Sequence, residues 1–217
     1  HLINVTVNET VDARTGIQSQ DRKGTGLATG PCGLSLGIRH HLVTGGLRYP
    51  AGPREHHVFL PDGAPPEPLT LGRWASISGA AYSTAAGSNT SVPVAILCAL
   101  FNVRLGYWWD SGQPPKRRRL FERLLPVQAA LFDEMCARTH GTAGRLWNLS
   151  DGGHFENMGG YELIRRRLPL IVIVDAEADP EYALNGLADL IRKARLDFGA
   201  EVRFLRTDEL DAALHPS

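Results

Sequence analysis

The chain carries the stretch LSDGGHFENMGG at Leu149–Gly160, and this stretch decides the fold and the site that the sequence predicts. A short apolar segment leads into it, and a helix-like pattern follows from Tyr161. Gly152 and Gly153 let the backbone turn sharply and leave the carboxylate of Asp151 uncovered. A carboxylate that ends a strand and faces a loop is well placed to act as a general base. In the simpler interpretation, the same side chain opens a Gly-rich turn or caps the next helix.

The segments around this stretch alternate between strand and helix patterns. Leu168–Val174 is apolar on both faces, which is typical of a strand buried in a parallel sheet. Glu181–Phe198 has apolar residues along one side, and Gly199 is a natural stop for a helix. From residue 146 onward we expect strand Leu146–Leu149, helix Tyr161–Arg167, strand Leu168–Val174, helix Glu181–Phe198 and strand Glu201–Leu205. This order is typical of a doubly wound α/β sheet, in which sites gather at the C-terminal ends of the strands.

The first two thirds of the chain give a less regular pattern. Leu2–Asn8 alternates polar and apolar residues and predicts a strand. Val11–Pro53 is rich in Gly and Thr and indicates mostly loop, with a strand near Leu42–Tyr49. We further expect a short strand at Val58–Leu60 and helices at Leu71–Ala86, Ser91–Gly106 and Leu120–Arg138.

Four blocks spread over the chain share the pattern of one known family. They are Leu149–Pro180, the small-residue block Trp74–Ala81, the strand-like Leu2–Asn8 and the helix-like Ile191–Gly199. Together they resemble the patatin-like phospholipase family, and in particular its large bacterial members. The resemblance implies an α/β fold, layered, with a mostly parallel central sheet flanked by helices. It also implies that residues 1–217 are the C-terminal portion of an acyl hydrolase domain, with a helical or insertion region at 61–145 and the Asp-Gly-Gly block and doubly wound end at 146–217.

The activity that this resemblance implies is lipid acyl ester hydrolysis by a Ser/Asp dyad, with no catalytic His and no cofactor. Asp151 would take the proton of the serine hydroxyl, the serine would attack the ester carbonyl, and water would release the acid from the acyl-enzyme. Gly152 and Gly153 would hold the carboxylate clear, and Ser78 and Gly79 would form a wall of the site. The expected substrate is a lipid or another acyl ester.

The nucleophile of this family lies on a Gly-x-Ser-x-Gly turn between a strand and a helix. The chain has a literal match at Gly33–Gly37, which makes Ser35 a weak candidate. The preceding segment has a loop pattern, and Ile38–His41 after the match does not clearly open a helix. We therefore expect the nucleophilic Ser upstream of His1, so that the N-terminal remainder of the same protein completes the site.

Composition limits the classes of function. The formal net charge is zero, which leaves no electrostatic footprint for nucleic acid as a partner. The three cysteines are widely spaced and form neither a disulfide framework nor a metal knuckle. Adjacent histidines at His40–His41 and at His56–His57 would point to opposite faces of a strand, so no metal site is expected there. The acidic residues of segment 175–181 could gather a divalent cation, although a solvated turn before a helix is the simpler interpretation.

No stretch of the sequence has the roughly 18 uninterrupted apolar residues needed to span a bilayer. Aromatic rings next to a basic cluster are typical of a membrane interface, and the candidate contacts are Trp108, Trp109, Arg117, Arg118 and Arg119. A core helix followed by a solvated loop is the other interpretation. The same surface underlies a second hypothesis, a non-catalytic lipid-docking or regulatory module that has kept the patatin-like fold. The expected location is cytoplasmic or membrane-associated, in a bacterium.

Overall fold

The computed structural model describes the central sheet and the helices that pack against it. The described residues are 1–10, 24–31, 33–38, 40–43, 57–58, 67–80, 106–112, 138–177 and 179–206, with the single residues 93, 128, 132, 133 and 136. Arg117, Arg118 and Arg119 lie outside them, and so do nearly all residues of the helices expected at Ser91–Gly106 and Leu120–Arg138. Of the expected helical region at 61–145, the elements with described boundaries are an α-helix at Leu71–Ser78, a strand at Tyr107–Asp110 and a short 3-10 helix at Gly141–Ala143.

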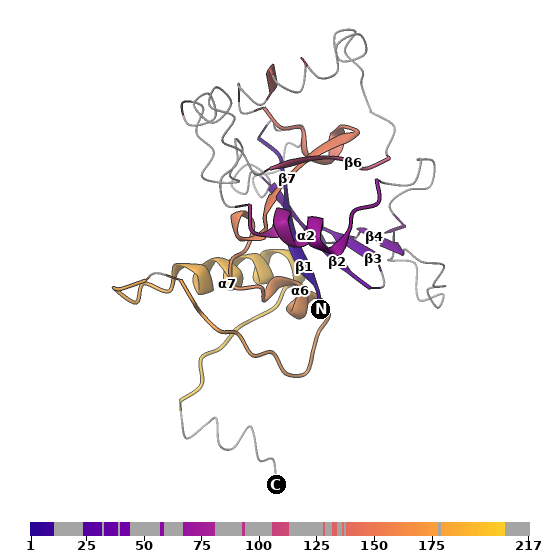
Figure 1. The fold of residues 1–217 in the computed structure, drawn as a ribbon. Helices are drawn as coiled ribbons and strands as arrows, with labels where there is room; N and C mark the ends of the chain where they lie inside the picture. Colours follow the sequence, from indigo (N-terminus) through magenta and orange to yellow (C-terminus); the bar gives the residue numbers. More distant parts are fainter. Residues whose placement is uncertain are drawn as a thin grey trace.

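A curled sheet of seven strands forms the centre of the described structure (Figure 1). Its strand order is β5-β4-β3-β2-β1-β7-β6. The strands are β1 (Ile3–Asn8), β2 (Gly24–Gly30), β3 (Gly33–Leu36), β4 (His40–Val43), β5 (His57–Val58), β6 (Tyr107–Asp110) and β7 (Leu146–Asp151). Every neighbouring pair is antiparallel except β4 and the two-residue strand β5, which pair in parallel.

The expected fold class, a patatin-like layered α/β fold with a mostly parallel central sheet flanked by helices, is wrong. β1 lies between β2 and β7 and runs antiparallel to both. The expected doubly wound end at 146–217 contributes only β7 to the sheet of the described residues. The strands β1 and β7 themselves are confirmed, but an apolar pattern along a strand does not specify the direction of its neighbours.

The Gly- and Thr-rich segment, expected to be mostly loop, contains β2, β3 and β4. β2 and β3 pair side by side, with Leu27 opposite Leu36 and Thr29 opposite Leu34. The three leucines are buried. The strands therefore owe their stability to the burial of these side chains and to strand pairing, and not to β propensity, which is low for glycine.

Three helices have described boundaries: α2 (Leu71–Ser78), α6 (Tyr161–Arg165) and α7 (Asn185–Phe198). The hydroxyl of Thr70 caps α2 by accepting a hydrogen bond of 3.2 Å from the N–H of Arg73, and Gly79 ends the helix. α7 ends at Gly199, as predicted, and the φ of 63° explains why a glycine stands there. Two short 3-10 helices, η2 (Gly141–Ala143) and η3 (Gly152–His154), flank β7 in the sequence.

Two apolar clusters hold these elements together. The larger cluster joins α2 to the sheet, and at its centre the ring of Trp109 meets the rings of Trp74 and Trp147 edge-on, with centroids 5.7 and 5.4 Å apart. The smaller cluster joins α6 and α7 and includes Phe155 and Tyr161, whose centroids are 5.0 Å apart. Phe155 directly follows η3, so the smaller cluster also anchors the turn after Asp151.

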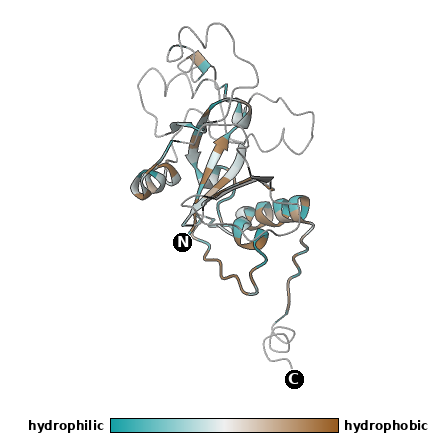
Figure 2. Cartoon of the chain, turned by 90° about the vertical axis from the view of Figure 1, so that its right-hand side faces the viewer, coloured by the Kyte–Doolittle hydropathy of each residue, from teal (hydrophilic) through white to brown (hydrophobic). Residues whose placement is uncertain are grey.

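The two other strands expected in the C-terminal region, Leu168–Val174 and Glu201–Leu205, belong to no strand of the described structure. Figure 2 shows hydrophobic residues along the extended chain that connects α6 to α7. The side chains of Leu170, Val172 and Val174 are 73%, 78% and 83% exposed. The expectation of a buried parallel strand is therefore wrong, because none of the described residues forms a strand beside this segment.

Candidate active site

Asp151 is the last residue of β7 and the residue from which η3 begins. Its Oδ1 accepts a hydrogen bond of 2.8 Å from the N–H of Gly153, so the side chain caps the short turn. The backbone is fixed as well, because the Thr6 hydroxyl on β1 donates to the Asp151 carbonyl over 2.7 Å. Within the described residues, the second carboxylate oxygen of Asp151 has no hydrogen-bond partner. One oxygen thus orients the carboxylate, and the other accepts no hydrogen bond from the described residues.

The two glycines after Asp151 are required for space. A Cβ on Gly152 would lie 2.5 Å from the carbonyl oxygen of Asn4, and a Cβ on Gly153 would lie 2.5 Å from Oδ1 of Asn157. Neither glycine has a positive φ. The dihedral angles of this turn are therefore open to other residues. The sequence suggested glycine for a sharp turn, whereas the structure requires it for space. A bare backbone lets β1 and the Asn157 carboxamide approach on either side of the carboxylate.

A pocket of about 390 Å³ lies in front of this turn. Its lining includes Asp151 and both glycines, Ser78 from α2, and Asn4 from β1. Leu2, Ile3, Ala75, Glu156, Asn157 and Gly159 complete the wall. The volume is in the range of small-molecule sites, and the mixture of apolar walls with a few polar groups is typical of them. The structure thus places four of the candidate site residues, Asp151, Gly152, Gly153 and Ser78, at one pocket.

Ser78 occupies the last turn of α2 and donates its hydroxyl proton to the carbonyl oxygen of Asn4 over 2.8 Å. Because this proton is already held by a backbone carbonyl, the contact favours a role for Ser78 in the wall. Gly79 ends α2 and does not line the pocket. It supports the site by terminating the helix next to Ser78.

Ser35 lies in the middle of β3, where it pairs with Ala28 of β2 and His41 of β4. Its exposed fraction is 6%, and it does not line the pocket that contains Asp151. A nucleophile turn needs a strand that gives way to a helix at the serine, whereas here the strand continues through it. The literal Gly-x-Ser-x-Gly match is thus part of the sheet.

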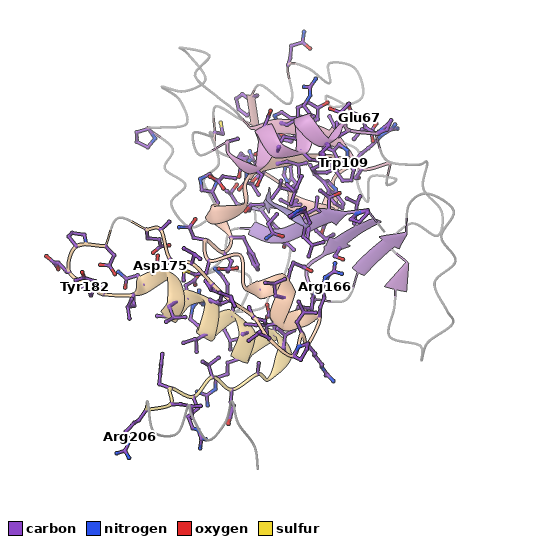
Figure 3. All side chains as sticks on the ribbon, turned by 60° about the horizontal axis from the view of Figure 1, so that its bottom comes forward. Glu67, Trp109, Arg166, Asp175, Tyr182 and Arg206 are labelled. Atoms are coloured by element: carbon purple, nitrogen blue, oxygen red, sulfur yellow. The ribbon has the colours of Figure 1, made fainter. Side chains whose placement is uncertain are left out.

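The aromatic candidates for membrane contact lie in β6. Trp109 is fully buried and its indole N–H donates to the backbone carbonyl of Glu67 over 2.9 Å (Figure 3). It is a core residue of the larger cluster, so the interpretation of Trp109 as a lipid contact is corrected here. Trp108, its neighbour on the other face of the strand, is half-buried.

Glu156 is a pocket residue that sequence reasoning missed. The side chain is 6% exposed and accepts hydrogen bonds from the backbone N–H groups of Met158 and Tyr161, at the start of α6. Burial raises the pKa of this carboxyl, while the two N–H donors and the nearby Lys193 oppose that shift. The signal in the sequence was a lone acidic residue shortly before a predicted helix start, where a carboxylate satisfies free N–H groups.

A buried polar network lies along β1 and β7. The Asn8 side-chain amide donates to Oδ1 of Asn148 over 2.8 Å and to Oγ of Ser150 over 2.9 Å. Ser150 Oγ is also 2.9 Å from Nδ1 of His154. A hydroxyl oxygen can accept two hydrogen bonds, so the direction of this contact is set by the tautomer of the His154 imidazole. Ser150 points to the sheet face opposite Asp151, so this network does not form a Ser-His-Asp triad with the pocket carboxylate.

The acidic residues after Val174 accept hydrogen bonds from neighbouring groups of the same chain. Asp179 accepts from the N–H groups of Ala183 and Leu184 over 3.0 and 2.7 Å, and these donors lower the pKa of its carboxyl. Glu177 accepts 2.6 Å from the side-chain amide of Asn157 at the pocket wall. In the described parts of the chain, no group of three or more His, Cys, Asp or Glu residues could hold a metal ion. The contacts of Asp179 belong to a turn before α7, and the helix begins at Asn185, four residues later than expected.

None of the helices in the described part of the chain is long and apolar enough to cross a membrane. Comparison with models of protein families, with curated proteins and with solved structures found no match. Any assignment of function must therefore come from the pocket and from the sequence blocks.

Proposed function

We propose that the chain carries the base of an acyl ester hydrolase, with Asp151 as the residue that takes the proton of a nucleophilic hydroxyl. The observation that carries the proposal is the state of its carboxylate. One oxygen is fixed by the N–H of Gly153, and the other has no partner within the described residues at a pocket of about 390 Å³. The antiparallel sheet gives no support to the proposal, so it rests on this geometry and on the sequence blocks that resemble the patatin-like family.

The proposed chemistry needs a hydroxyl nucleophile next to the open oxygen of Asp151. The carboxylate accepts the hydroxyl proton as the oxygen attacks the ester carbonyl, and the alcohol leaves with that proton. Water then attacks the acyl-enzyme, again with Asp151 as base, and releases the acid. We assign the nucleophile to a Ser in the N-terminal remainder of the same protein. Ser78 is assigned to the wall, because its proton is held by the Asn4 carbonyl.

The pocket wall suits an acyl ester or lipid substrate. Leu2, Ile3 and Ala75 supply apolar surface, and Asn4 and Asn157 supply polar groups. A short apolar segment of the substrate would lie along the first set, with the ester directed toward the second.

The test is reaction with a fluorophosphonate probe, read by intact mass and peptide mapping, on this chain and on the complete gene product. We expect a label on a Ser upstream of residue 1 in the complete product. In the complete product, Asp151→Asn should lower the rate of ester hydrolysis about 100-fold or more, since general bases contribute about 10²–10⁴-fold. Glu201→Gln, at an exposed position that does not line the pocket, is the matched control and should keep wild-type turnover. Wild-type turnover in Asp151→Asn, with circular dichroism unchanged, would falsify the proposed role.

A further inference from the structure

The segment Leu168–Val174 is an extended apolar stretch that belongs to no strand of the described structure. Its side chains alternate, with exposed fractions of 73% for Leu170, 78% for Val172 and 83% for Val174. The intervening Ile173 is half-buried and packs against the cluster between α6 and α7. The segment thus has the two-residue periodicity of a strand, with one face on the protein and the other open.

The backbone of this segment is also open. Residues 169–176 make no hydrogen bond between backbone groups within the described parts of the chain. An extended apolar segment with free N–H and C=O groups is a template for pairing with another strand. The open backbone and the exposed apolar side chains together are typical of a surface that binds another chain.

The charges at the two ends of the segment are complementary to those of a second, antiparallel copy. No charged residue lies within Leu168–Val174, whereas Arg167 precedes it and Asp175 follows it. Arg165 and Arg166 form ion pairs with Glu162, so Arg167 supplies the basic charge at this end. Figure 3 shows Arg166 and Asp175 at opposite ends of α7. When two such strands run antiparallel, the basic end of each lies beside the acidic end of the other. We propose that Leu168–Val174 pairs antiparallel with the same segment of a second copy of the chain, in a twofold-symmetric dimer.

The charges also define the register. With Ile171 on the twofold axis, Leu170 lies opposite Val172 of the second copy. Arg167 has a φ of 52° and lies just before the extended segment, so its side chain, and not a paired backbone position, brings its charge near Asp175 of the second copy. Each dimer then contains this ion pair twice, once at each end of the paired strands. Across the central region, apolar side chains face apolar side chains, which is the arrangement that stabilises a pair of strands.

Pro169 fits this register in one of its two forms. Residues in an antiparallel pair alternate between hydrogen-bonded and non-hydrogen-bonded positions. When Ile171 occupies a non-hydrogen-bonded position, Pro169 does so too, and the N–H that proline lacks would have pointed away from the partner strand. Leu170 then exchanges both of its backbone hydrogen bonds with the second copy.

The dimer would also stabilise one wall of the pocket. Asp175 accepts a hydrogen bond of 2.9 Å from the N–H of Glu177, and Glu177 in turn accepts from the side chain of Asn157. Asn157 lines the pocket that contains Asp151. Pairing of the strand would therefore order the chain that positions Asn157. The dimer itself does not depend on the proposed activity.

The first experiment measures sedimentation velocity of the full 217-residue chain over a series of concentrations, and we expect a monomer–dimer equilibrium. Asp175→Asn keeps the oxygen that accepts from Glu177 and removes the charge. Losing two surface ion pairs should raise the Kd about 2- to 30-fold. Arg167→Glu should weaken the dimer at least as much. Arg167→Glu combined with Asp175→Lys should restore it, because the reversed charges again face each other across the two copies.

Three further variants test whether association uses this segment. Val172→Asp places a charge in the paired strand and should abolish the dimer. Val202→Asp alters another exposed apolar residue, outside the segment, and should leave the Kd unchanged. Ile171→Cys should form a disulfide between copies, because the Cα atoms of a non-hydrogen-bonded pair are about 4.5 Å apart.

Three results would overturn the proposal, given variants with wild-type circular dichroism. The first is a chain that stays monomeric at every concentration, which would assign the open edge to a strand of another polypeptide or to a lipid surface. The second is a dimer that persists in Val172→Asp. The third is a double charge reversal that fails to restore association, since the register requires that rescue.

Discussion

Substitution of Gly152 by Ala tests whether the turn after Asp151 depends on the close approach of β1. An added Cβ would lie 2.5 Å from the carbonyl oxygen of Asn4 and 2.9 Å from its carbonyl carbon. Ordinary contacts of a Cβ begin at 3.4 Å, so the overlap with the oxygen is 3.4 − 2.5 = 0.9 Å. Both atoms belong to the backbone of β1, which is paired on each side by β2 and β7 and has little freedom to move away.

The expected cost is that of an overpacked site. Forcing one methyl group into a filled space typically destabilises a protein by about 1–3 kcal/mol, and a rigid backbone neighbour places Gly152→Ala in the upper half of that range. Gly153→Ala should cost less. Its Cβ would meet Oδ1 of the Asn157 side chain, which can rotate if its hydrogen bond to Glu177 breaks.

Gly72→Ala is the matched control for these two variants. A Cβ at Gly72, in the first turn of α2, would have no atom within 4 Å. Alanine there should stabilise the protein by about 0.5–1 kcal/mol through its higher helix propensity. Urea denaturation followed by circular dichroism gives the three free energies of unfolding on one scale. A Gly152→Ala variant as stable as the wild type would refute the argument that lack of space, and not the dihedral angles, requires glycine after Asp151.

Two further variants test the core and the pocket acid. Trp109→Ala should lower the free energy of unfolding by about 3–5 kcal/mol in urea denaturation, because the side chain is fully buried between Trp74 and Trp147. A change within about 0.5 kcal/mol would be typical of a surface residue. Trp109 would then again be a candidate for lipid contact. Burial raises the pKa of Glu156 in the folded state, so the native protein holds this proton more tightly than the unfolded chain. Stability from this group is therefore fully present below the unfolded pKa near 4.5 and is lost as the pH rises toward the folded pKa. Glu156→Gln should remove that decline, which denaturation curves at a series of pH values would show, and an unchanged pH profile would contradict the assignment.

The parts of the fold that local patterns specify were predicted correctly. β1 and β7 have alternating apolar residues, α6 ends in basic residues, and α7 ends at a glycine with positive φ. β2 was missed, because the string GTGLATG has low β propensity and becomes a strand through pairing with β1 and β3. The error at Leu168–Val174 is of the opposite kind. A continuous apolar run indicates that a segment needs a partner, but it does not identify the partner.

The sequence placed the consecutive residues of the candidate site and one distant residue, Ser78, which entered through the family resemblance. Asp151, Gly152 and Gly153 are consecutive, and their turn follows directly from their composition. Asn4 and Glu156 enter the pocket from a distant strand and from a loop that folds back onto α6. Their positions depend on the antiparallel pairing of β1 with β7, which the sequence patterns did not reveal.

The amide of Asn8 has a consequence for how this protein can change over evolution. Its two hydrogen bonds, to Asn148 and Ser150, exist in one alignment of β1 against β7, the same alignment that sets Val5 opposite Asp151. A slip by one residue would turn these polar groups into the apolar core and carry Asp151 to the other face of the sheet. The network thus stabilises the register of β1 against β7 that places the Asp151 carboxylate at the pocket. Substitution of Asn8 alone would leave buried polar atoms unpaired, so we expect these three positions to change together or not at all.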